Sequence, residues 1–455
     1  MSTLLLKNAE LLVTMDDERR RIPDGGVYVV DNVIRQVDAT DRLPPTADEA
    51  IDAQGMVVLP GLVNTHHHLY QSLTRAVPAA QDAELFDWLR TLYPIWAGLT
   101  GEAVYVSALI ALGELMLSGC TTVADHLYIY PNDSRIDDEI RAARELGVRF
   151  HPGRGSMSLG KSKGGLPPDS VVEDEQAVLT DCARIVEEYH DPSPNSMCRI
   201  VIAPCSPFSV TPDLMRASAL FARERGLTLH THVAETHDEE DFCMRKFGMR
   251  PVDLMRQLDW VGPDVWWAHC VTLNQDEVSI MAETGTGVAH CPSSNMRLGS
   301  GIAPIRALVD AGARVGLAVD GSASNDSGHM FAEARQAMLL QRVQHGATAM
   351  SAEETLWLGT RGGAAVLGRE DIGCLAPGLA ADFVAIDMGR LAFAGAQADP
   401  LAALLFCAPP NVDLSVINGK VVVRDGTLLG LDLSATVAHH NQLALELLER
   451  ARNSA

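Results

Sequence analysis

A short apolar stretch closes on three histidines: Pro60-Gly61-Leu62-Val63-Asn64-Thr65-His66-His67-His68. Its apolar residues follow a Pro-Gly pair and carry no charge, which is typical of a buried β-strand. Side chains two residues apart in an extended segment point the same way, so His66 and His68 can face one metal ion while His67 points elsewhere. The alternative is a loop with three solvated histidines, which the apolar strand beside them disfavours. The stretch therefore predicts a ligand pair at the end of a strand.

Further strand-like runs follow this one, and helical stretches alternate with them. Such alternation is typical of βα units around a parallel sheet. Judged by β-branched and apolar content between Gly, Pro or Asp, the strands cover residues 56–66, 120–126, 148–154, 199–205, 227–232, 265–269, 287–290 and 314–320. Eight such units predict an α/β fold with a closed (β/α)₈ barrel of the TIM type. In that barrel the carboxyl ends of all strands surround one mouth, where active sites lie.

A second pair of histidines ends the fifth of these strands, in His230-Thr231-His232-Val233-Ala234-Glu235. By the same alternation, His230 and His232 share one face of the strand. Glu235 lies just past the strand end, where its carboxyl group could reach a water molecule bound to a metal ion. The alternative is two core histidines followed by a surface glutamate. The first motif, a similar pair of histidines at another strand end, disfavours this alternative.

His269 and Asp320 end the sixth and eighth predicted strands. A lone aspartate at a strand end is more often the N-cap of the next helix than a catalytic group. Here Asp320 follows an apolar strand and precedes Gly321, which allows a tight turn. We therefore expect both side chains to lie at the barrel mouth with the histidine pairs.

The two ends of the chain are predicted to form a smaller β unit. Residues 1–58 and 368–434 contain short β-rich runs, and the pair Asn418-Gly419 is a strong signal for a hairpin turn. We expect these two segments to fold together into a small β-sandwich domain beside a catalytic barrel of residues 59–367. Apolar residues at helical spacing predict that residues 435–455 form a closing helix.

Composition excludes several classes of partner. The chain has 36 basic and 59 acidic residues and a net charge of -23, which disfavours nucleic acid and anionic membrane surfaces as partners. The nine cysteines are scattered and never spaced Cys-x-x-Cys, so neither a disulfide framework nor a thiolate zinc site is expected. No apolar run reaches the length of about 18 residues needed to span a membrane. We expect a cytoplasmic protein, and a homo-oligomer is compatible with the sequence.

Together these motifs resemble the amidohydrolase superfamily, in its branch of mononuclear purine, pyrimidine and triazine aminohydrolases. The resemblance covers nearly the whole chain, from the N-terminal β segment to Gly426. It implies a metal-binding set and an overlapping catalytic set of residues. The metal ligands would be His66, His68, His232 and Asp320, and the catalytic residues Glu235, His269 and Asp320.

Such a residue set suits one divalent ion per chain, with Zn²⁺ as the first expectation and Fe²⁺ as the alternative. Neutral imidazoles and one carboxylate bind these ions and leave a position for water, which then ionises near neutral pH. An amino group leaves poorly unless it is protonated, so Glu235 would carry a proton to it. Asp320 would receive the first proton, and His269 would polarise the ring or orient the hydroxide. Binuclear relatives have a lysine at the end of strand four. Residues 199–206 contain none, which favours one ion.

Segments 68–75, 151–160, 164–169 and 322–326 are similar to those of 8-oxoguanine deaminases and their triazine-hydrolysing neighbours. The similarity implies a small heteroaromatic substrate, with hydrolysis of 8-oxoguanine to uric acid and ammonia as the first expectation. The alternatives are an s-triazine aminohydrolase of the hydroxyatrazine type, a guanine or isoguanine deaminase, and a catalytically inactive scaffold. Candidate substrate contacts, each with a purely structural role as its alternative, are Gln71, Arg154, Cys205 and Trp88.

Overall fold

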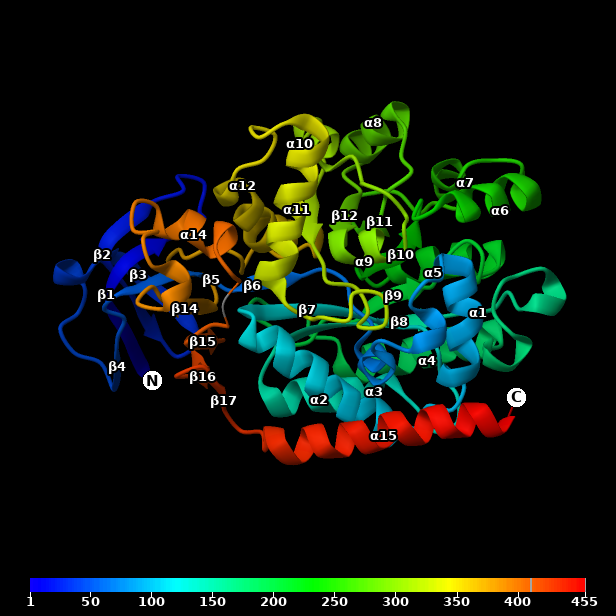
Figure 1. Cartoon of the computed structure of the whole chain (residues 1–455), viewed down its shortest axis with the longest axis horizontal. Coiled ribbons are helices and arrows are strands. Elements are labelled where there is room, and N and C mark those ends of the chain that lie inside the picture. The colour runs from blue at the N-terminus through cyan, green and yellow to red at the C-terminus, as the bar shows by residue number, and fades with distance from the viewer. Residues whose placement is uncertain (410, 455) are drawn as a thin grey trace.

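The computed structural model describes residues 1–409 and 411–454. Its larger part is a barrel of eight parallel strands together with the helices around it (Figure 1). Neighbouring strands are hydrogen-bonded in chain order. The barrel strands are β6 (Leu62–Asn64), β7 (Cys120–Leu127), β8 (Arg149–Ser156), β9 (Val201–Pro204), β10 (Thr228–Val233), β11 (Val265–His269), β12 (Gly287–His290) and β13 (Val315–Leu317). The main-chain N–H of Thr65 donates to the Leu317 carbonyl at 3.0 Å and joins the first strand to the last. The predicted (β/α)₈ barrel is confirmed.

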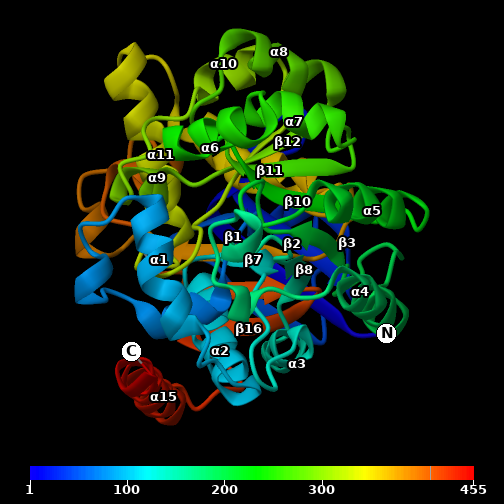
Figure 2. The same ribbon diagram turned by 90° about the vertical axis from the view of Figure 1, so that its right-hand side faces the viewer.

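Helices surround these strands, as Figure 2 shows. The helices are α1 (Leu85–Trp96), α2 (Gly101–Leu117), α3 (Ile136–Leu146), α4 (Glu175–Tyr189), α5 (Pro212–Arg223), α6 (His237–Phe247), α7 (Pro251–Gln257), α8 (Gln275–Thr284), α9 (Pro292–Arg297), α10 (Ile305–Asp310), α11 (Met330–His345), α12 (Ala352–Trp357), α13 (Gly363–Val366), α14 (Pro400–Phe406) and α15 (Leu433–Ser454). A short 3₁₀ helix, η2 (Leu69–Thr74), follows the histidine run of the first strand. The closing helix α15 packs on α1, α2 and η2. Residue 455 of the predicted closing helix lies outside the described residues.

Both chain ends contribute to a second, mostly antiparallel sheet at the left of Figure 1, as expected. Its order is β17-β16-β15-β14-β5-β1-β2-β3, with β4 paired to β1. Its strands are β1 (Thr3–Val13), β2 (Arg21–Val30), β3 (Val33–Ala39), β4 (Glu49–Asp52), β5 (Met56–Pro60), β14 (Phe383–Asp387), β15 (Leu414–Ile417), β16 (Lys420–Arg424) and β17 (Thr427–Leu428). Asn418 and Gly419 have φ angles of 51° and 77° and form the predicted hairpin turn. The division into domains at 58/59, 367/368 and 434/435 stays a prediction.

The prediction of one continuous first barrel strand over residues 56–66 was wrong. Residues 56–60 form β5, which lies in the small sheet between β1 and β14, and only the next three-residue strand, β6, belongs to the barrel. The N–H of Gly61 still donates to the Asp382 carbonyl, whereas that of Leu62 already donates to the Gly119 carbonyl. A Cβ atom at Gly61 would lie 2.1 Å from the Thr121 side chain, so glycine allows the chain to pass from one sheet to the other here.

A buried ion pair joins the barrel to the small sheet. Arg149, at the start of β8, donates from Nε and Nη2 to the two carboxylate oxygens of Asp382 at 3.0 and 3.1 Å. Its Nη1 donates to the carbonyls of Asn195 and Ser196, and the N–H of Asn418 donates to Asp382 at 2.6 Å. Both side chains are buried, so these hydrogen bonds replace the solvation that the two charges lose.

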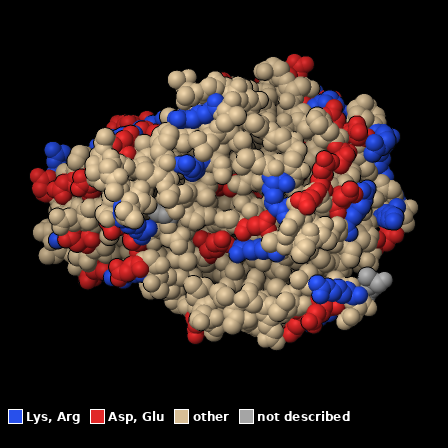
Figure 3. All heavy atoms as spheres, in the orientation of Figure 1, with Lys and Arg blue, Asp and Glu red and all other residues tan. Residues whose placement is uncertain are grey.

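The outer surface carries mixed charge. Basic and acidic side chains are interspersed on the face drawn in Figure 3. Of the helices formed by residues 1–409 and 411–454, none combines the length and the apolar character of a membrane span.

Replacing Arg149 with alanine should lower the free energy of unfolding by about 3–5 kcal/mol, because Asp382 would stay buried without its cation. The matched control is Arg42→Ala, which removes an exposed ion pair with Asp38 and should cost about 1 kcal/mol or less. Urea denaturation followed by tryptophan fluorescence measures both variants. Equal losses in the two would contradict a specific role for the buried pair.

Candidate metal centre and active site

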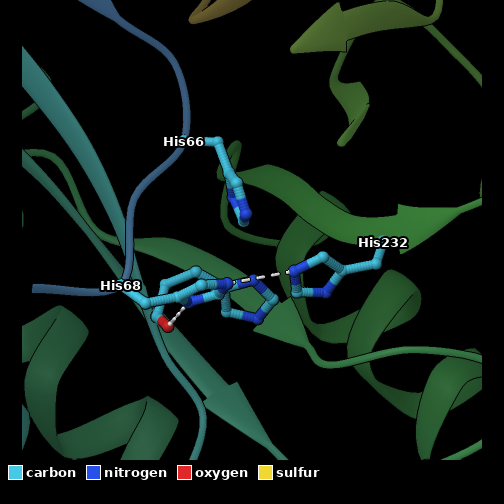
Figure 4. A group of neighbouring side chains, drawn as sticks. His66, His68 and His232 are labelled. Atoms are coloured by element: carbon cyan, nitrogen blue, oxygen red, sulfur yellow. Dashed lines mark hydrogen bonds between the residues drawn. The ribbon is translucent and has the colours of Figure 1, made fainter. Parts of the chain in front are cut away.

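The four predicted metal ligands converge at the mouth of the barrel. Figure 4 shows the imidazoles of His66, His68 and His232 pointing toward one another. Nε2 of His68 lies 3.2 Å from Nε2 of His232. Oδ1 of Asp320 lies 3.2 Å from Nε2 of His66 and 3.4 Å from Nε2 of His68. Ligand atoms around a tetrahedral zinc ion lie about 3.4 Å apart, so the spacing fits Zn²⁺.

Backbone carbonyls fix the tautomers of two of these histidines. Nδ1–H of His68 donates to the carbonyl of His126, and Nδ1–H of His232 donates to the carbonyl of Cys205, both at 2.7 Å. In a neutral imidazole the other ring nitrogen then carries a lone pair. The two Nε2 atoms therefore face each other as acceptors at 3.2 Å, an arrangement that a cation bound by both would stabilise.

A relay of two rings orients the third histidine. Nδ1–H of His230 donates to the carbonyl of Trp266 at 3.1 Å, which leaves Nε2 of His230 as an acceptor. Nδ1–H of His66 donates to that atom at 2.7 Å. Nε2 of His66 is thus also a lone pair aimed at the centre. His230 is not a ligand in this arrangement; it supports one, as hydrogen-bonded neighbours of metal ligands commonly do.

Burial keeps these rings neutral. Removal from water lowers the pKa of His66 and His232 well below the usual value for histidine, and the neighbouring His68 acts in the same direction. Neutral histidine is the form that binds a metal ion. Three inward lone pairs and one carboxylate, all buried, form a donor set that fits one Zn²⁺ ion.

Asp320 is held from its other side. Its N–H donates to the His66 carbonyl at 3.2 Å, and Ser324 Oγ donates to Oδ2 at 3.0 Å. The backbone at Asp320 has a φ of 61°, a left-handed conformation that is rare for residues other than glycine. This strain at the strand end turns the carboxylate toward the histidines.

His126 also lies beside the centre, although the sequence did not single it out as a ligand. One nitrogen each of His66, His68, His126 and His232 lie within 4.8 Å of one another. Nε2–H of His126 donates to the Ala203 carbonyl at 2.6 Å, and its Nδ1 has no partner in the described part of the chain. β9 contains no lysine, so the strand lacks the bridging ligand of a binuclear centre.

Glu235 and His269 stand next to the centre. Oε2 of Glu235 lies 3.5 Å from Nε2 of His269, and Nδ1–H of His269 donates to Asn295 Oδ1 at 3.0 Å. Burial, followed by the nearby carboxylates of Asp320 and Glu239, raises the pKa of Glu235 well above the usual value. A carboxyl group whose pKa is raised in this way is suited to carry a proton.

A small cavity of about 30 Å³ opens onto these side chains. Three of the four predicted substrate contacts, Gln71, Cys205 and Trp88, lie in its wall. The amide of Gln71 is fully buried and makes no hydrogen bond of regular geometry with other described residues.

Arg154 does not reach this cavity, so the prediction that it contacts substrate finds no support. The inner side of β8 is formed by Gly153 and Gly155, and Arg154 points outward between them. Its guanidinium donates to Glu173 and Asp181 and lies 3.9 Å from the centre of the Tyr130 ring.

Much of the cavity wall escaped sequence analysis. One face of α1 supplies Leu85, Trp88, Leu89 and Tyr93, whose spacing follows the helical repeat. The hydroxyl of Tyr93 is buried and has no hydrogen-bond partner among the residues that the structure describes. The sequence analysis singled out only Trp88 on this face. The remaining wall residues that were missed are Tyr128, Phe208, Leu298 and Ser324.

Known proteins share this sequence and architecture. The chain is 49% identical to 8-oxoguanine deaminase of Pseudomonas aeruginosa over 93% of its own length and 95% of that protein. It is 41% identical to hydroxydechloroatrazine ethylaminohydrolase of Pseudomonas sp. strain ADP, over 84% of this chain and 81% of the relative. A crystal structure of atrazine chlorohydrolase from Arthrobacter aurescens with zinc matches with a TM-score of 0.93 and 34% identity, over 97% of this chain and 100% of the other.

The family model described as the amidohydrolase family matches residues 57–422. That range begins in β5, includes every barrel strand and ends in β16. The resemblance that the histidine motifs suggested is confirmed, since the same strand ends supply the convergent donor set and the matched range contains all of them. The chain belongs to the amidohydrolase family.

Proposed function

We propose that the enzyme hydrolyses the exocyclic amino group from a heteroaromatic ring, with 8-oxoguanine as its substrate. Water and 8-oxoguanine would give uric acid and ammonia. The observation that carries the proposal is the buried Glu235 carboxyl group beside His269 and a zinc-type donor set, all facing one cavity. The 49% identity to an 8-oxoguanine deaminase supports the choice of purine.

The residues divide the proton transfers between them. His66, His68, His232 and Asp320 would hold the ion, which when bound supplies the Lewis acidity that makes water a nucleophile near neutral pH. In our proposal Asp320 accepts a proton from the attacking water. Glu235 gives its own proton to the amino group, which leaves as ammonia, and the proton held by Asp320 then returns to Glu235. His269, fixed by Asn295, orients the reacting centre.

The cavity wall offers polar atoms suited to an oxidised purine. Gln71 can donate to and accept from the imide edge of the ring. Burial raises the pKa of the Cys205 thiol to about 12, so it stays protonated and can donate a weak hydrogen bond. We assign Cys205, together with the unpartnered hydroxyl of Tyr93, to the edge where 8-oxoguanine carries an N7 donor and an O8 acceptor. Trp88 would cover the ring.

An aminohydrolase of s-triazines is the second candidate. The 41% identity to hydroxydechloroatrazine ethylaminohydrolase supports it, because that protein also removes an amine from a heteroaromatic ring. Guanine and isoguanine are further ring substrates of the same chemical class. We also propose that the enzyme works in the cytoplasm without nucleic acid as a partner, and a homo-oligomer remains compatible with the chain.

Zinc content tests the proposed ligands. The wild type should hold about one equivalent of zinc per chain. His66→Ala should lose both the metal and the activity, because the proposed donor set then lacks one ligand. Elemental analysis and ammonia release measure the two effects, and circular dichroism checks that the barrel is intact. About two equivalents, both required for turnover, would contradict the mononuclear centre.

Glu235→Gln tests the proton carrier. The amide has nearly the same shape but cannot transfer the proton, so kcat should fall by about 10²–10⁴-fold while zinc stays bound. Steady-state kinetics and metal analysis of the same preparation provide the measurement. A variant that keeps near-normal turnover would assign proton delivery to another group, with His269 as the nearest.

A panel of aminated rings tests the substrate. If the cavity reads the N7 and O8 edge, kcat/KM for 8-oxoguanine should exceed that for guanine by about 10⁴-fold, because guanine would leave buried polar groups unpaired. Ammonia release across 8-oxoguanine, guanine, isoguanine, cytosine and aminotriazines measures this. A ratio below about tenfold would refute edge reading. Ammonia from an aminotriazine but from neither purine would favour the second candidate.

A further inference from the structure

The backbone that leads into Glu235 is held in an uncommon conformation. Ala234, the residue before it, has a φ of 55°, in the left-handed region that residues with a Cβ seldom adopt. The carbonyl of Ala234 accepts hydrogen bonds from the N–H groups of Val271 and Thr272 at 2.8 and 2.9 Å. Conformations of this kind persist where surrounding contacts impose them. The carbonyl side of Ala234 is thus fixed by the loop after β11.

The N–H side is fixed by a single carboxylate. Oε1 of Glu239, in the first turn of α6, accepts from the N–H of Ala234 at 3.0 Å, and its Oε2 accepts from the N–H of Glu235 at 2.8 Å. The Glu239 side chain is completely buried. Both oxygens are therefore committed to the backbone immediately around the proposed proton carrier.

These contacts exceed what is needed to cap a helix. Thr236 already caps α6, since its hydroxyl accepts from the N–H of Glu239. Glu277 plays an ordinary capping part at α8: it accepts from the N–H of Asn274 and pairs with Arg250 at 2.7 Å. Glu239 has no basic side chain within ion-pair distance among the residues described. Two backbone N–H groups alone compensate this buried carboxylate, although burying such a group is costly.

We propose that Glu239 is a positioning residue for catalysis. By binding the N–H groups of Ala234 and Glu235, it holds the strained turn after β10 and so directs the Glu235 carboxyl group toward the reacting centre. The inference rests on the proposed function in one respect, the role of Glu235 as proton carrier. What the inference adds is that proton delivery by Glu235 depends on Glu239, a side chain that would contact neither substrate nor metal.

The matching substitution is Glu239→Gln, which keeps the shape but replaces one acceptor oxygen with an NH₂ group that cannot accept from a backbone N–H. A shift of about 1 Å in a catalytic group can cost about 10²-fold in rate. We expect kcat to fall by about 10- to 100-fold, with KM changed by less than about threefold, because the proposed substrate contacts Gln71, Cys205 and Trp88 stay in place. Zinc content should stay at the wild-type value.

A double-mutant cycle on the zinc-loaded full chain tests whether Glu239 acts through Glu235. The cycle compares Glu239→Gln, Glu235→Gln and the double variant, with kcat measured on the best substrate from the panel above. Once Glu235 cannot deliver a proton, its position no longer matters, so Glu239→Gln should then cost less than about threefold. Asp174→Ala is the control: it removes the carboxylate that caps α4 by accepting from the N–H groups of Gln176 and Ala177, and it should lower the melting temperature with kcat within about twofold of wild type.

Two results would overturn the proposal. One is a Glu239→Gln variant with wild-type kcat. The other is a decrease in kcat by the same factor when Glu239→Gln is added to the wild type and to Glu235→Gln, as general loosening of the structure would give. If Glu239→Gln fails to fold, Glu239→Asp enters the same cycle, because its shorter side chain keeps the charge but can reach only one of the two N–H groups. Near-normal turnover in Glu235→Gln alone would instead refute the proposed role of Glu235 as proton carrier, and the cycle separates that outcome from the other two.

Discussion

Closure of the barrel is the constraint on which the site depends. The histidine pair follows the first strand and Asp320 follows the last, so these side chains are neighbours only because β6 and β13 lie side by side. Backbone hydrogen bonds make the join, from Thr65 to Leu317 and from Asp320 to His66. The second of these links a proposed ligand directly to another. Any change that opens this seam would separate the carboxylate from the imidazoles before it affected the rest of the core.

Hydrogen bonds to the backbone fix the direction of the histidine lone pairs around the centre without a bound cation. The carbonyls of His126 and Cys205 accept hydrogen bonds from the Nδ1–H groups of His68 and His232. The carbonyl of Trp266 orients His66 through the ring of His230, which lies between them. These carbonyls belong to neighbouring barrel strands or the residue just after one, and cannot move without disturbing the sheet. The orientation of the donor set is therefore a property of the backbone, and side-chain rotation contributes little freedom to it.

Strand ends could be predicted well from the sequence, because apolar runs that stop at Gly, Pro or a polar residue mark them directly. Barrel geometry predicted that the strand-end histidines and Asp320 share one mouth, whereas the choice of His66, His68, His232 and Asp320 as ligands came from the resemblance to the amidohydrolase superfamily. Two features could not be predicted in this way. An apolar run does not reveal which sheet it joins, so β5 was merged with the first barrel strand. Arg154 was predicted to lie at the mouth because the alternation of inward-facing and outward-facing side chains along β8 was not taken into account. The glycines on either side of Arg154 were the signal that the neighbouring positions face the crowded interior of the barrel. The wall built by α1 depends on tertiary packing that periodicity does not encode.

The position of β5 also bears on how the chain reaches its native state during synthesis. β5 pairs on one side with β1 and on the other with β14, so Pro60 lies opposite Phe383. Only Gly61 separates this strand from β6, which carries the first histidines into the barrel. A ribosome must therefore make most of the chain before the segment that bears His66 and His68 is anchored on both sides. Pairings of such long sequence separation form slowly. The nascent protein is thus expected to hold a stretch of unpaired apolar strand for much of its translation, the state in which a chain of this size is most exposed to aggregation and to chaperones.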